Sequence, residues 1–209
     1  MGLPKEQAGG FTYADYRTWP EDERWELIEG VAWNMSPAPT RSHQRILLNL
    51  VRLIADITDS GLCETYLAPF DVRLPDDPAE SADRADRGTR PDDEPSDEAI
   101  TTVVQPDISV FCRPDVLDDA GARAAPDLVV EILSPSTSYK DQTHKLALYE
   151  RHGVREYWIV NGEARWVMVY RIGEDNRYGK PDYYRARQEL EVITSAVLGG
   201  AGIPVDSFL

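Results

Sequence analysis

Long hydrophobic runs are missing from this chain of 209 residues. No stretch reaches the roughly 18 consecutive apolar residues of a membrane-spanning helix. The first residues, MGLPKEQAGG, contain no apolar core of a signal peptide. We therefore expect no membrane span and a cytoplasmic location. Hydrophobic residues nevertheless make up 42% of the chain, which is enough for the core of a domain of this length.

Cysteine and histidine are scarce. The two cysteines, Cys63 and Cys112, lie far apart and form no CxxC pair, so we expect buried free thiols rather than a disulfide framework. The histidines stand at positions 43, 144 and 152, without the spacing of zinc ligands. The GxSxG and P-loop motifs are absent as well. These absences argue against zinc enzymes, α/β-hydrolases and P-loop proteins.

Positive charge is in short supply. Lys and Arg number 22 against 37 Asp and Glu, which gives a net charge of −15. This balance argues against broad, unassisted nucleic-acid binding, because such binding needs basic side chains that displace counterions. Residues 75–99 hold ten acids and three arginines, and the resulting −7 is close to half of the total. Almost no large apolar side chain lies there, so we expect a flexible acidic insertion.

The two ends of the chain differ in their expected order. Residues 1–10 predict a disordered tail, and 11–209 predict one domain interrupted only by the acidic insertion. Near its start, the alternation of apolar and polar residues over 25–36 predicts a β-hairpin. Glu29 and Gly30 are expected to form its turn.

Helix patterns occur in three places. The clearest is 42–59, where apolar residues recur at spacings of three and four. Thr40 or Ser42 is the expected cap of this helix. Shorter helices are expected over 11–23 and 139–152.

Strand patterns fill most of the remaining chain. Apolar runs bounded by turn residues predict strands, and Asn161-Gly162 predicts the turn of a second hairpin. The fold class is therefore α/β (α+β): a central mixed β-sheet flanked by helices, with an N-terminal β-hairpin. The expected strands are 62–74, 101–112, 127–133, 155–160, 165–171 and 183–193.

One predicted strand carries an acid among apolar residues. Glu131 interrupts the run VVEIL at 129–133, and a carboxylate there is costly unless it is paired, protonated or bound to metal. Asp107 stands near the start of the preceding apolar run. If the two strands pair, both carboxylates project from the same side. With a backbone carbonyl and waters they form an all-oxygen site, which Mg²⁺ prefers.

The chain resembles a known family at these residues. Pro-Asp at 106–107 followed by Glu-Ile-Leu at 131–133 is similar to the signature of the PD-(D/E)XK nuclease superfamily. Most of the chain, apart from the tail and the acidic insertion, resembles the Uma-two branch of restriction-endonuclease-like bacterial proteins. The matching segments are WELIEG (25–30), SPAPTRSHQRI (36–46), YLAPFDVRL (66–74), VVQPDISVF (103–111), PDLVVEILSPST (126–137), DQTHKLALYERHGVREYWIV (141–160) and IPVDSFL (203–209).

The resemblance implies a restriction-endonuclease-like core of helix, three strands, helix and strand. In it Asp107 and Glu131 are the two acids that hold Mg²⁺, with Mn²⁺ as a substitute. The backbone carbonyl of Ile132 is implied as a third ligand.

The lysine of the signature is missing, because Leu133 occupies its position. Related families carry this lysine on the following helix, which makes Lys145 the candidate and Lys140 the runner-up. A catalytic lysine would stabilise the negative charge of an attacked phosphate. The alternative for Lys145 is a solvated ion pair with Asp141, four residues earlier, worth about 0.2–0.5 kcal/mol.

Three further residues are candidates for supporting roles. His43 at the start of the long helix suits either contact with a phosphate or water, or a local helix-end hydrogen bond. Glu29 suits either a third acid ligand or a structural place in the hairpin turn. Gln105, two residues before Asp107, is expected to point at the site.

These observations favour a metal-dependent endonuclease that hydrolyses DNA phosphodiester bonds, with Asp107, Glu131 and Lys145 as its catalytic residues. The alternative is a non-catalytic nucleic-acid-binding or regulatory protein on the same fold. It is motivated by Leu133 and by the acidic charge. Related nucleases often act as dimers, so a homodimer is expected, with the apolar C-terminal region as its interface.

Overall fold

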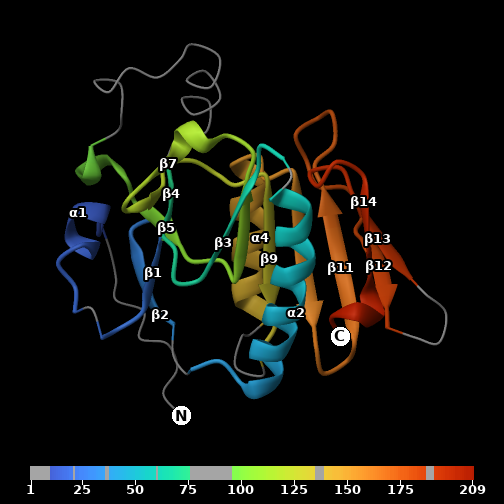
Figure 1. The fold of residues 1–209 in the computed structure, drawn as a ribbon. Coiled ribbons are helices and arrows are strands. Elements are labelled where there is room, and N and C mark those ends of the chain that lie inside the picture. The colour runs from blue at the N-terminus through green and yellow to red at the C-terminus, as the bar shows by residue number, and fades with distance from the viewer. Residues whose placement is uncertain are drawn as a thin grey trace. The chain divides into compact units, whose positions relative to one another are not determined.

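The computed structural model describes residues 10–20, 22–35, 38–59, 61–75, 96–134, 139–186 and 191–209, without the side chains of 139–142 (Figure 1). The predicted tail (1–10) and insertion (75–99) lie almost entirely outside these residues, so both stay predictions, as does the single domain. The structure groups the chain into two compact units. Unit 1 comprises 1–37, 70–105 and 116–125, and unit 2 comprises 38–69, 106–115 and 126–209.

Unit 1 contains a six-stranded sheet in the order β2-β1-β5-β4-β8-β7. Its small core is aromatic and aliphatic: Tyr13, Leu27, Ile100 and Val103 are buried together. The bounds are α1 Tyr13–Tyr16, β1 Trp25–Ile28, β2 Val31–Asn34, β4 Val72–Leu74, the 3-10 turn Asp97–Ala99, β5 Thr102–Val104, β7 Leu117–Asp118 and β8 Gly121–Ala122. The 3-10 turn Pro114–Val116 contains residues of both units.

The predicted N-terminal hairpin is confirmed. β1 and β2 pair antiparallel from Trp25 opposite Asn34 to Ile28 opposite Val31. Glu29 and Gly30 form the turn with positive φ angles of 51° and 75°, the backbone that a tight hairpin turn needs. The helix expected over 11–23 is shorter, four residues long. Pro20 explains part of this difference, because a proline disfavours helical backbone in the residue before it.

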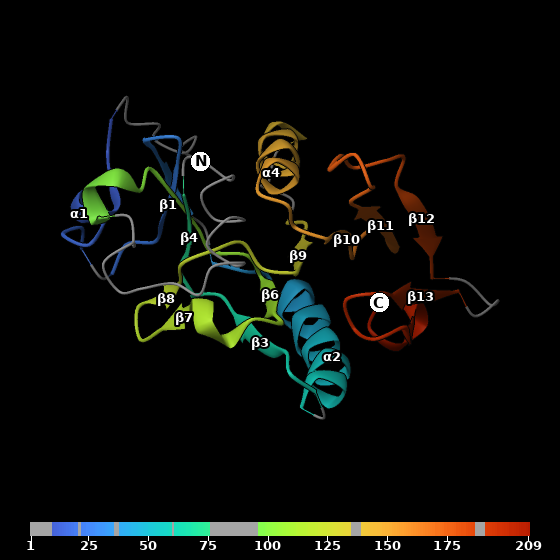
Figure 2. The same cartoon turned by 90° about the horizontal axis from the view of Figure 1, so that it is seen from above.

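Unit 2 contains a mixed six-stranded sheet in the order β12-β11-β10-β9-β6-β3. Only β9 and β10 run parallel in it. Helices α2 and α4 lie on its opposite faces (Figure 2), which confirms the predicted class of a mixed sheet flanked by helices. The bounds are α2 Arg41–Thr58, β3 Glu64–Leu67, β6 Ile108–Phe111, β9 Leu128–Ile132, α4 Tyr139–Arg151, β10 Glu156–Asn161, β11 Trp166–Arg171, β12 Asp182–Arg185, β13 Val192–Ser195, β14 Ala201–Pro204 and the 3-10 turn Val205–Ser207.

The hydrophobic core of unit 2 lies between α2 and one face of the sheet. Ile46, Leu50 and Ile54 of α2 are buried at helical spacing, as the sequence predicts. Thr40 caps this helix by accepting a hydrogen bond from the His43 N–H at 3.2 Å. Alternate strand residues complete the core, namely Ile108, Val110, Leu128, Val130, Ile132, Trp158, Val160, Val167 and Val169. Among the described residues, no helix combines the length and apolar character that crossing a membrane requires.

Three predicted strands are each divided in two. Residues 62–74 form β3 and β4, and residues 101–112 form β5 and β6, with each pair split between the two sheets. The breaks fall at Pro69 and Pro106, since proline lacks the N–H that a sheet ladder requires. The third, 183–193, ends as β12 and resumes as β13.

The second hairpin is confirmed with a longer turn than the Asn-Gly pair predicts. β10 and β11 pair up to Asn161 opposite Trp166, so four residues connect them. Glycine at position 162 suits the packing and not the turn, because an added Cβ would overlap the Ile46 side chain.

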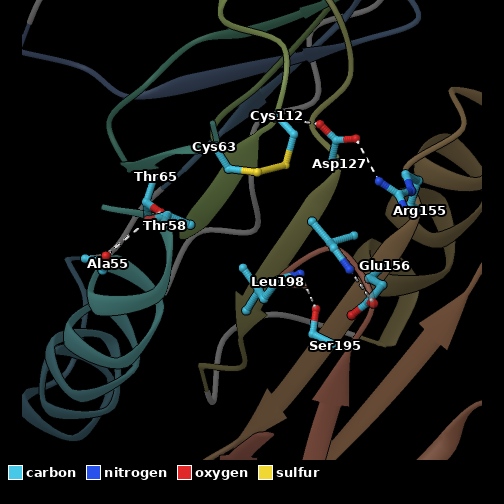
Figure 3. Close-up of a disulfide and its surroundings, with 11 residues drawn as sticks. Ala55, Thr58, Cys63, Thr65, Cys112, Asp127, Arg155, Glu156, Ser195 and Leu198 are labelled. Atoms are coloured by element: carbon cyan, nitrogen blue, oxygen red, sulfur yellow. Dashed lines mark hydrogen bonds and ion pairs between the residues drawn. A yellow bond between two sulfur atoms is a disulfide. The ribbon is translucent and has the colours of Figure 1, made fainter. Parts of the chain in front are cut away.

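The prediction of two free thiols is wrong. Cys63 and Cys112 form a disulfide across a sequence separation of 49 residues (Figure 3). The physical reason is strand pairing: β3 and β6 are antiparallel with Glu64 opposite Phe111, so the next residues outward face each other. The separation of the cysteines in the sequence gives no information on how β3 and β6 pair.

Candidate functional site

Asp107 lies at the start of β6, immediately after the proline that breaks the strand. β6 and β9 are antiparallel with Ile108 opposite Val130, and continuing this register by one residue places Asp107 opposite Glu131. Asp107 Oδ2 accepts a hydrogen bond from the Ile132 N–H at 2.7 Å. Because a strand residue points its N–H and C=O to the same neighbouring strand, the Ile132 carbonyl faces the side of Asp107.

His43 reaches Asp107 from the first turn of α2. Its Nε2 lies 3.1 Å from Asp107 Oδ2, so the imidazole is paired with a residue of another element. Burial lowers the pKa of His43, but the hydrogen bond and charge of Asp107, the charge of Glu131 and the backbone of Ile132 together raise that pKa above its ordinary value. The buried Nδ1 has no hydrogen-bond partner among the described residues.

Glu131 points from β9 toward α4. Its Oε1 accepts hydrogen bonds from Lys145 Nζ at 2.9 Å and from the Tyr149 hydroxyl at 3.0 Å. Lys145 and Tyr149 are four residues apart on α4, which puts them one above the other on one helix face. Lys145, the candidate for the missing lysine of the signature, therefore contacts Glu131, the second acid.

Tyr149 is a site residue that the sequence reasoning missed. It is fully buried, and its ring meets the Tyr157 ring edge to face at 4.9 Å between centroids. The pKa of Tyr157 is raised well above its ordinary value by burial and by the nearby charge of Glu131. The spacing of four from Lys145 was a usable signal, because it predicts that the two side chains reach the same neighbour.

The other predicted residues belong to unit 1 or fall outside the described side chains. Gln105 belongs to unit 1, where its side chain accepts from Arg24 and donates to Tyr16 and Asp71. Glu29 is an exposed residue of the hairpin turn in the same unit. The Lys140 side chain lies outside the described residues.

The donor set fits a hard divalent cation. It consists of two carboxylates from opposed strand positions and the Ile132 carbonyl, all oxygen atoms of the kind that Mg²⁺ binds. Asp107 Oδ1 accepts no hydrogen bond from the described residues. Within the described ranges, no cluster of three or more His, Cys, Asp or Glu side chains is placed to hold a metal. Water would therefore complete the coordination, as is usual for Mg²⁺.

A mixed sheet that opposes two carboxylates, with a helix lysine beside one of them, matches the arrangement that the family resemblance implies for a nuclease-like protein. Comparison with known families agrees. Residues 13–206 match the model of the Uma2 family, described as "Putative restriction endonuclease", and the chain belongs to this family. The family resemblance drawn from the sequence is thereby confirmed.

Two individual proteins extend the comparison. "Uncharacterized protein slr1290" of Synechocystis sp. is 24% identical over 181 residues, which cover 85% of this chain and 82% of that protein. The crystal structure of "a putative nuclease belonging to DUF820" from Anabaena variabilis superposes with a TM-score of 0.66 at 20% identity, covering 95% of this chain and 97% of that one. At this identity the structural likeness shows the fold.

Proposed function

We propose that this protein is a metal-dependent endonuclease that hydrolyses DNA phosphodiester bonds. The observation that carries the proposal is the contact between Glu131 and Lys145, on a strand whose register places Asp107 opposite Glu131. Two acids can hold a metal ion that activates water, and an ammonium group can stabilise the charge of an attacked phosphate. Membership of the Uma2 family supports the same class of reaction.

Each residue has a distinct role in this proposal. Asp107, Glu131 and the Ile132 carbonyl would hold Mg²⁺ or Mn²⁺. When bound, the ion would lower the pKa of a water nucleophile and neutralise charge on the phosphate. His43 and the Ile132 N–H fix the Asp107 carboxylate through hydrogen bonds to Oδ2. Lys145 supplies positive charge to the phosphate from α4, so Leu133 at the signature position does not remove the function.

The direct test is cleavage of supercoiled plasmid and of single-stranded DNA with Mg²⁺ or Mn²⁺, with EDTA as the metal-free control. We expect cleavage by the wild type, none in EDTA, and none by Asp107→Ala or Glu131→Ala. Cleavage that survives both substitutions would overturn the proposal, because the activity would then come from other residues or from a contaminant.

A second function has its own support. Leu133 in place of the lysine and the net charge of −15 favour a non-catalytic nucleic-acid-binding or regulatory protein on this fold. Such a protein would bind DNA in a gel-shift assay and would not cleave it with Mg²⁺ or Mn²⁺. Titration calorimetry with Mn²⁺ beside the gel shifts separates the two. The homodimer and the cytoplasmic location stay predictions.

A further inference from the structure

We infer that Tyr149 is a positioning residue that fixes the metal-binding orientation of Glu131 independently of Lys145. The inference rests on the proposed function, since it concerns the same site. Both side chains donate to the same oxygen, Glu131 Oε1, at 3.0 Å and 2.9 Å. If Lys145 and Tyr149 both served only to hold the carboxylate, one of the two hydrogen bonds would be redundant.

The two donors differ in how firmly their own positions are fixed. Tyr149 is fully buried, and the edge-to-face contact with Tyr157 of β10 fixes the plane of its ring. Its hydroxyl is carried by a rigid ring with two side-chain torsions. Lys145 carries its ammonium on a flexible four-carbon chain, and its side chain is 13% exposed. Tyr149 is therefore the fixed donor and Lys145 the movable one.

This difference resolves a conflict in the role of Lys145. Its ammonium contacts Glu131 in the structure, yet the proposed chemistry requires it at the phosphate. Moving toward a phosphate weakens its hydrogen bond to Oε1, and a carboxylate held by that bond alone would then be free to rotate. The Tyr149 hydroxyl keeps Oε1 in place during this movement, so Glu131 still presents its carboxylate to the ion. Removing a group that orients a metal ligand in this way weakens metal affinity by about 10- to 100-fold.

The chain offers a matched control. Tyr178 is a partly buried tyrosine of the same unit whose hydroxyl donates to the Val154 carbonyl at 2.8 Å. Tyr178→Phe and Tyr149→Phe each remove one hydroxyl and one hydrogen bond, and neither leaves a large cavity. Only Tyr149→Phe removes a donor to Glu131.

The experiment is Mn²⁺ binding by titration calorimetry without DNA, together with the Mn²⁺ concentration at half-maximal plasmid cleavage. Wild type, Tyr149→Phe, Tyr178→Phe and Lys145→Met are compared, after thermal unfolding shows that each is folded. We expect Tyr149→Phe to bind Mn²⁺ about tenfold more weakly and to regain near-normal cleavage at high Mn²⁺. Tyr178→Phe should match the wild type. Lys145→Met should bind Mn²⁺ within about threefold of the wild type and lose cleavage at every concentration.

The outcomes separate the inference from the proposed function. Equal Mn²⁺ affinity in Tyr149→Phe and Tyr178→Phe, beside a wild type that binds and cleaves, overturns the inference alone. The same holds if Lys145→Met loses as much affinity as Tyr149→Phe, since the lysine would then hold the carboxylate. A wild type that neither binds Mn²⁺ nor cleaves overturns the proposed function and the inference with it.

Discussion

The two faces of the sheet in unit 2 are built from alternate residues of the same strands, and they differ in chemistry. Toward α2, the row Val130, Trp158 and Val169 runs across three strands and is wholly apolar. Toward α4, the next row starts at Glu131 and continues through Ile159 and Met168. Because successive strand residues point to opposite faces, one short strand can serve both the core and the candidate site.

Two glutamates sharpen this comparison. Glu156 lies in register with Leu128 on the α2 face and is 2% exposed. From the described residues it accepts only neutral N–H groups, from Trp158 Nε1 at 3.1 Å and from Ala196 and Val197 at 2.7 and 3.3 Å. Glu131 on the α4 face meets an ammonium group and a hydroxyl instead. The first carboxylate joins β10 to the turn after β13, and the second joins β9 to α4.

The largest effect should come from the α2 face. Trp158→Ala removes a fully buried indole, and such truncations cost about 3–5 kcal/mol. The control is Met168→Ala on the α4 face, where the side chain is only partly buried and the expected cost is about 1 kcal/mol. Urea denaturation measures both. Equal losses of unfolding free energy in the two variants would contradict the expected difference between the two faces.

A smaller effect is expected from the same chemical change on each face. Glu156→Gln puts an amide NH₂ where N–H donors converge, which leaves at least one of them unpaired, and should lower the free energy of unfolding by about 2 kcal/mol. Glu131→Gln keeps an acceptor for Lys145 and Tyr149, so its stability should stay within about 1 kcal/mol of the wild type. The comparison fails if Glu131→Gln is the less stable variant in urea titrations of the metal-free proteins.

The smallest effect concerns His43, which links the α2 side to Asp107. Its pKa in the folded protein lies above the ordinary value, so its pairing adds stability at pH below the unfolded pKa of about 6.5. That stability is lost as the pH rises through the folded pKa. In EDTA, the wild type should lose more stability between pH 6 and pH 8 than His43→Asn does. An identical pH dependence in both proteins would refute the pairing.

Local signals in the sequence were sufficient for much of this fold. The apolar spacing of α2, the Glu29-Gly30 turn and the acid within β9 depend on neighbouring residues, and each was predicted. The choice of Lys145 as the candidate lysine followed from the family resemblance, and its contact with Glu131 is a finding of the structure.

Long-range pairing was beyond these signals. The Cys63–Cys112 disulfide depends on the register of β3 and β6, which no local pattern specifies. The prolines at 69 and 106 stand where the strands break, but the sequence does not show that the chain changes sheets there. The contact of Tyr149 with Glu131 depends on how α4 packs against β9, which the sequence pattern alone does not specify.

We expect the opposed carboxylates Asp107 and Glu131 on the α4 face to serve the proposed cleavage and to contribute little to stability. Asp107→Asn tests it most directly, since the amide keeps an acceptor for the Ile132 N–H and removes the charge. Plasmid cleavage with Mn²⁺ and thermal unfolding are measured on the same preparation. We predict unfolding close to that of the wild type and cleavage no greater than in EDTA. Cleavage at the wild-type rate by a normally folded Asp107→Asn would contradict the account.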